Sequence, residues 1–181
     1  MRYKKKSEDK NKALNEYITK DSLLCESLDD HGSVFVMGMD IYLPKELDKK
    51  IVSKFKQKFI AMEKYKGYDP KYYIAQGYDS LNGEATYNMG LILDGNKTDN
   101  ITEHVENAKK VLQKVVGPEY ADKVKIDLPI HPSSSEKGVI ATQDNGEYNN
   151  ALELFYCALI GTVEDSFCWH SKVKKPFFLE W

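Results

Sequence analysis

Lys71-Tyr-Tyr-Ile-Ala-Gln-Gly-Tyr-Asp79 and Ala85-Thr-Tyr-Asn-Met-Gly-Leu-Ile-Leu-Asp-Gly95 specify the centre of the expected fold. Both runs are rich in β-branched and aromatic residues, and Asn82-Gly83 stands between them. An Asn-Gly pair between two such runs is a strong signal for a β-hairpin, because the tight hairpin turns need positive φ. The sequence therefore predicts that residues 72–78 and 85–93 are adjacent strands of one sheet.

The remaining elements are predicted from periodicity and from helix-ending residues. Ser33 begins an apolar run that ends at Pro44 and is typical of a buried central strand. Asn100 followed by Glu103 resembles a capping box at the start of a helix. The predicted elements are a strand at 34–42, a lysine-rich amphipathic helix at 45–66, a helix at 101–116, a short strand at 124–128, a long surface loop at 129–150 and a helix at about 148–163.

This order predicts an α+β fold. Helices that return over one face of a mainly antiparallel central sheet give a sandwich of the ferredoxin-like kind. The period changes at about residue 32, so residues 1–32 are predicted to be a basic, helical N-terminal extension and residues 33–181 a single α+β domain.

Composition excludes several classes of protein. The 181 residues carry a formal charge of −2, so general attraction to nucleic acid is absent and any such binding must be local. Three scattered cysteines do not form a disulfide framework, and no run approaches the roughly 20 apolar residues of a membrane span. We expect a cytoplasmic protein with reduced thiols and no membrane partner.

Three motifs resemble a known family. Asp40-Ile-Tyr-Leu-Pro44, Thr86-Tyr87-Asn88 followed by Leu91-Ile-Leu-Asp-Gly95, and Tyr156-Cys-Ala158 occur in this order. Over roughly residues 33–160 they look like the rolling-circle replication initiators of filamentous phages and prophages, which are HUH endonucleases. The resemblance implies an HUH-type palm, in which an acidic residue and a His-bulky-His triplet bind a divalent metal and a tyrosine attacks a DNA phosphate.

The chain departs from that pattern at its chemical positions. Gln76 stands where the resemblance implies an acid, and Thr86 and Asn88 stand where it implies histidines. Neutral amide and hydroxyl oxygens are poor replacements for imidazole ligands, so we expect a degenerate metal site, no metal and no cofactor. Tyr156 has apolar neighbours and is expected to be a core aromatic; in the alternative it is the nucleophile of an active nickase. His104, in a charged helix, is expected to be solvated.

Aromatic and cationic residues gather at the hairpin. Twelve tyrosines are unusual for this length, and those near lysines are able to stack on bases or to anchor a protein interface. The alternative is that alternate tyrosines simply cover the sheet. The candidate binding residues are Lys71, Tyr72, Tyr73, Tyr78 and Tyr87, together with Lys4, Lys5 and Lys6 of the basic arm.

Two functions follow from these observations. In the first, a non-catalytic phage or prophage protein on a replication-initiator-like scaffold binds DNA or a host nucleic-acid-processing protein such as a Cas nuclease, for example as an inhibitor of host nuclease defence of the anti-CRISPR type. In the second, the protein is an active metal-dependent single-strand DNA nickase that uses Tyr156.

Overall fold

The computed structural model describes residues 21–47, 49–77, 84–129, 138–144, 146–157 and 168–173. Its centre is a six-stranded sheet in which every paired strand is antiparallel. The strands are β1 (Ser33–Pro44), β2 (Lys71–Gln76), β3 (Glu84–Asp94), β4 (Lys125–Asp127), β5 (Gly138–Thr142) and β6 (Cys168–His170). The helices are residues 21–31, α2 (Lys50–Tyr65), α3 (Ile101–Val116) and α4 (Tyr148–Cys157).

The strand order β4-β1-β3-β2-β6 confirms the α+β class and the antiparallel centre. Within it, the chain order β1-α2-β2-β3-α3-β4 is that of the ferredoxin-like fold. The predicted hairpin is present, because β2 pairs with β3 from Lys71 opposite Ile92 to Gln76 opposite Tyr87. Residues 78–83, which include Tyr78 and the Asn82-Gly83 turn, lie outside the described residues.

The outer edge of β1 has two partners. Ser33 to Met37 pair with β5, and Asp40 to Tyr42 pair with β4. The predicted surface loop at 129–150 is therefore interrupted by β5, while the helix predicted from about residue 148 is α4, which begins at Tyr148. The five residues of β5 are too few for a clear alternating pattern, and pairing with β1 is what makes them a strand.

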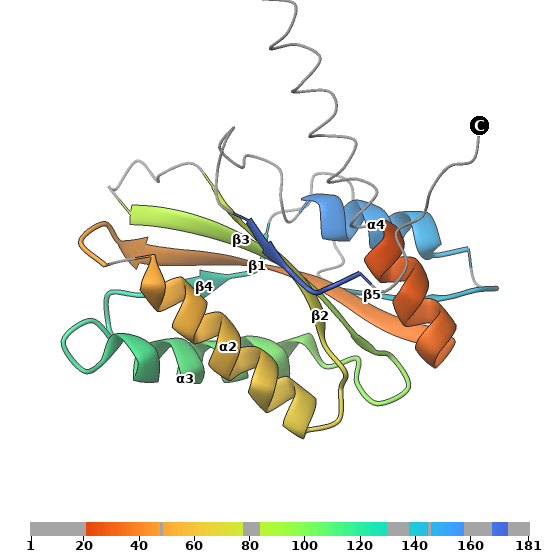
Figure 1. Ribbon diagram of the computed structural model, residues 1–181, viewed down its shortest axis with the longest axis horizontal. Helices are drawn as coiled ribbons and strands as arrows, with labels where there is room; N and C mark the ends of the chain where they lie inside the picture. Colours follow the sequence, from red (N-terminus) through yellow and green to blue (C-terminus); the bar gives the residue numbers. More distant parts are fainter. Residues whose placement is uncertain are drawn as a thin grey trace, which may run out of the picture.

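Helices cover both faces of the sheet (Figure 1), whereas the sequence indicated helices on one face. On the first face, α2 and α3 pack on the side chains that alternate along β1 and β3, such as Met37, Met39 and Met89. On the second face, residues 21–31 and α4 pack on Val34, Val36 and their neighbours. The helix of residues 21–31 ends at Gly32, whose φ of 71° and N–H bond to the Leu28 carbonyl (2.6 Å) form a left-handed cap.

The second helical layer lies very close to the sheet. A Cβ atom on Gly90 of β3 would lie 2.5 Å from Cδ2 of Phe155 in α4, so the phenyl ring rests directly on the strand backbone. Phe155 is fully buried, and with Leu23 and Leu24 it forms the centre of the second core. None of the helices in the described ranges has the length and hydrophobicity needed to cross a bilayer.

Candidate functional site

Part of the second sheet face is polar and lies where the resemblance places a metal site. Tyr87 and Met89 point into the core under α2 and α3, so Thr86 and Asn88 point to the opposite face, as predicted. Both side chains are largely covered, since each residue is 8% exposed. Asp40 of β1 is the cross-strand partner of Asn88, and the Asn88 amide donates a hydrogen bond to its carboxylate at 2.7 Å.

Gln76 does not belong to this group. It is paired with Tyr87 and has the same strand parity as Ile74, which lies in the core under α2 and α3. Gln76 therefore lies on the other face from Thr86 and Asn88, and the expected set of three is not assembled. The acid beside Asn88 is Asp40, which begins the Asp40–Pro44 motif but was not predicted to belong to the metal site.

The Asp40 carboxylate is electrostatically unfavourable where it lies. Burial and the nearby Asp127 raise its pKa, and the hydrogen bond from Asn88 only partly offsets them. Burial, followed by the charges of Asp40 and Asp127, also raises the pKa of Tyr42 on the same strand. Asp127 faces Asp40 directly across the β1–β4 pair and is itself bonded by Lys125.

Asn88 and Asp40 bind each other, and the polar side chains of this face do not form a ligand set. Throughout the described part of the chain, no three His, Cys, Asp or Glu side chains are grouped so that they would hold a metal ion. The Asn88 amide is fixed by its bond to Asp40, and Gly77 lies so close that a Cβ there would be 2.6 Å from Asn88 Oδ1. The side chain of Tyr156 lies outside the described residues.

Three of the residues predicted to bind on the hairpin are largely covered. Lys71, Tyr73 and Tyr87 are 9%, 2% and 3% exposed, so they offer little surface to a partner. The Tyr73 ring stacks on His170 of β6 with the centroids 5.7 Å apart. The alternative interpretation, in which tyrosines cover the sheet, describes these positions better.

The other predicted binding residues are placed as follows. Tyr72 is half-buried under Lys56, whose Nζ lies 5.6 Å from the ring centroid. Lys71 Nζ lies 4.0 Å from the Asp30 carboxylate at the end of the first helix. Tyr78 and the arm residues Lys4, Lys5 and Lys6 lie outside the described residues.

The outward face of α2 presents lysines instead. Lys50, Lys54, Lys58 and Lys64 are exposed, and Tyr65 at the end of the helix is 93% exposed. The only acid in α2 is Glu63, which is fully buried. The sequence showed that this helix is rich in lysine. The buried residues of α2 show which lysines share the exposed face.

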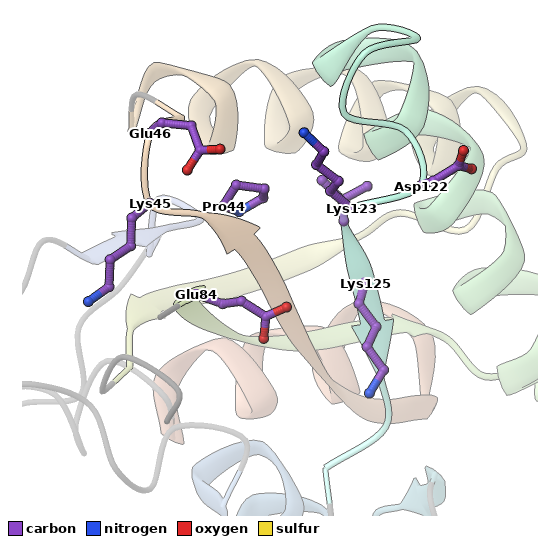
Figure 2. Close-up of a pocket in the computed structure, with 8 residues that line it drawn as sticks. Pro44, Lys45, Glu46, Glu84, Asp122, Lys123 and Lys125 are labelled. Atoms are coloured by element: carbon purple, nitrogen blue, oxygen red, sulfur yellow. The ribbon is translucent and has the colours of Figure 1, made fainter. Parts of the chain in front are cut away.

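A shallow pocket of about 520 Å³ opens where β1 ends and β3 and β4 begin (Figure 2). Its lining residues are Pro44, Lys45, Glu46, Glu84, Asp122, Lys123, Val124 and Lys125. Positive and negative side chains balance there, and the lining contains no histidine, cysteine or hydroxyl nucleophile. Its carboxylates and amines are of kinds that can act as general acids and bases, but the lining offers no nucleophile–base–orienting series of the kind that marks a catalytic site.

A buried polar network joins α2 to α3. His104 Nδ1 lies 2.8 Å from Glu63 Oε2, and His104 Nε2 lies 2.7 Å from the Thr98 hydroxyl. His104 and Glu63 are both fully buried, so the expectation that His104 is solvated is wrong. An acid–imidazole–hydroxyl series is the order of a catalytic triad, but a fully buried imidazole cannot reach a substrate. The network holds the two helices together.

Comparisons of the chain with protein-family models, with curated proteins and with solved structures found no match.

Proposed function

We propose that this is a non-catalytic phage or prophage protein on a replication-initiator-like scaffold, which acts by binding. The observation that supports this most is the hydrogen bond between Asn88 and Asp40. At the place where the resemblance implies metal ligands, an amide and a carboxylate bind each other on a covered part of the sheet.

The chemistry of these groups favours loss of catalysis. A metal-dependent nickase needs a cation to polarise the phosphate and to stabilise the charge that develops on it. Thr86 and Asn88 offer neutral oxygens, and Gln76 lies on the opposite face of the sheet. Losing a single outer partner of a metal ligand already reduces metal affinity or activity about 10- to 100-fold. Losing both imidazoles should abolish nicking.

The proposed partners are DNA or a host nucleic-acid-processing protein such as a Cas nuclease. The resemblance to replication initiators supports this class of partner, and so does the exposed lysine face of α2. Inhibition of a host nuclease, as by anti-CRISPR proteins, is one activity that a binding protein of this kind would have.

We expect purified protein to leave both single-stranded and supercoiled DNA intact in the presence of Mn²⁺ or Mg²⁺. Gel analysis of the two substrates, with Tyr156→Phe as the matched variant, measures this. Wild type and Tyr156→Phe should give the same result, because Thr86 and Asn88 are poor ligands for the metal that would activate a phosphate for attack. Metal-dependent nicks that disappear in Tyr156→Phe would establish the nickase alternative instead.

A further inference from the structure

The exposed residues of α2 lie on one continuous face. Lys50, Lys54 and Lys58 follow one another at intervals of four residues, and Lys64 and Tyr65 continue the same side into the last turn. We call this row of exposed residues from Lys50 to Tyr65 the track. At 1.5 Å per residue it is about 22 Å long. The opposite side of the helix packs on the sheet through Val52, Phe55 and Phe59, so the lysine face points to solvent.

Positive charge is concentrated on this helix although the whole chain carries a formal charge of −2. The α2 sequence contains five lysines and one glutamate, and that glutamate is buried against His104. By contrast, α3 mixes both signs, with Glu106 and Lys109 paired at 3.8 Å. A surface of one sign attracts a polyanion locally even when the net charge does not.

Tyr65 gives the track an aromatic end. It is the only large hydrophobic side chain among the described residues that is found exposed. Tyrosine has a flat face that stacks on any base, and such stacking requires a base that is not enclosed in a duplex. Lysines alone would suit any polyanion, so Tyr65 is the residue that favours an unpaired strand.

We propose that the outward face of α2 binds single-stranded nucleic acid, with Lys54, Lys58 and Lys64 contacting phosphates and Tyr65 stacking on a base. This proposal rests on the nucleic-acid branch of the proposed function and narrows it to one surface. The track is long enough for about six nucleotides at the 3.4 Å spacing of a stacked strand.

Fluorescence anisotropy with a labelled 12-nucleotide oligothymidylate, over a series of salt concentrations, tests the proposal on the full chain. The triple variant Lys54→Gln, Lys58→Gln, Lys64→Gln should bind more weakly. Its slope of log affinity against log salt should be shallower by about 2, since each phosphate contact on a single strand contributes about 0.7. The matched control is Lys109→Gln, Lys110→Gln, Lys114→Gln on α3, which removes the same charge and should leave the slope almost unchanged.

Tyr65 is tested separately. Tyr65→Ala should weaken oligothymidylate binding about 5- to 150-fold without changing the salt slope, because it removes stacking and not a phosphate contact. Tyr65→Phe should bind like the wild type. A duplex of the same length should bind more weakly than the single strand and should be insensitive to Tyr65→Ala.

The possible failures are distinguishable. If oligothymidylate binds but the α2 and α3 triple variants lose affinity equally, the surface assignment is wrong while nucleic-acid binding stands. If Tyr65→Ala has no effect, or if the duplex binds as tightly as the single strand, the single-strand assignment is wrong. If no nucleic acid binds at all, both this proposal and the DNA branch of the proposed function are wrong.

Discussion

The ionised carboxylate of Asp40 destabilises the folded state. A carboxyl whose pKa is raised on folding stabilises the protein when protonated, and that contribution is lost as pH rises through the folded pKa. Burial and Asp127 raise the pKa of Asp40 above its ordinary 3.8, so at neutral pH its charge destabilises the folded state. Such a residue is a candidate for function, because stability alone would not select it.

Asp40→Asn should therefore raise the free energy of unfolding at pH 7 by about 1 kcal/mol, since it removes the buried charge opposite Asp127. Urea denaturation at pH 7 and at pH 3 measures the change. The gain should shrink at pH 3, where the wild-type carboxyl is protonated. Asp122→Asn is the control, because it makes the same charge change at an exposed position. Destabilisation at pH 7 would show that the bond from Asn88 outweighs the desolvation.

Substitution of Glu63 or His104 should lower the free energy of unfolding strongly. Glu63→Ala leaves the buried His104 imidazole and the Asn107 amide without their carboxylate partner, and each buried polar group left without a partner costs about 1–3 kcal/mol. Chemical denaturation of the variant tests this against Glu106→Ala, which removes an exposed glutamate from α3 and should change stability by less than about 0.5 kcal/mol. Equal effects of the two substitutions would contradict the structural role assigned to the network.

The contact of α4 with β3 depends on the missing side chain of Gly90. A Cβ there would lie within 2.6 Å of two atoms of the Phe155 ring, so Gly90→Ala must displace the ring or the helix. We expect a loss of about 1–3 kcal/mol, typical of overpacking. The double variant Gly90→Ala, Phe155→Leu should be less destabilised than the sum of the two single variants, because the residues share one contact. Simple additivity in thermal or urea unfolding would argue against that contact.

Elements with strong local signals were predictable from the sequence. The helix predicted at 101–116 is α3, and Asn100 Oδ1 accepts the predicted capping bond from the Glu103 N–H. The strands β5 and β6 were missed because they have five and three residues and become strands only by pairing with β1 and β2. Local propensity contains no information about such partners.

The site was predictable only in part, for a similar reason. Strand alternation correctly placed Thr86 and Asn88 on one face, since that inference needs a single strand. The position of Gln76 depended on the register between two strands, and the burial of Tyr73 depended on a distant segment that contains His170. Asp40 was overlooked because the acid was expected on the strand of Gln76. For α2, the sequence predicted only a lysine-rich amphipathic helix and did not identify its exposed face as a binding surface.

Taken as a whole, the molecule has two cores separated by one sheet. The α2–α3 side is closed by the Glu63–His104 network, and the other side is closed by the first helix and α4. Leu23, Leu24 and Leu28, which precede residue 32, are buried in the core of the second face. The helix of residues 21–31 is therefore packed on the sheet. The proposed binding face of α2 points away from both cores, so substitutions there should leave folding intact.

The double pairing of β1 also has a consequence for synthesis in the cell. Val36 is opposite Val139 in β5, so the ribosome must add roughly a hundred residues before that edge is covered. At about 5–20 residues per second, the apolar edge of β1 stays open for roughly 5–20 seconds. An open apolar strand edge is a template for aggregation, so the nascent chain is most in need of a chaperone during that interval.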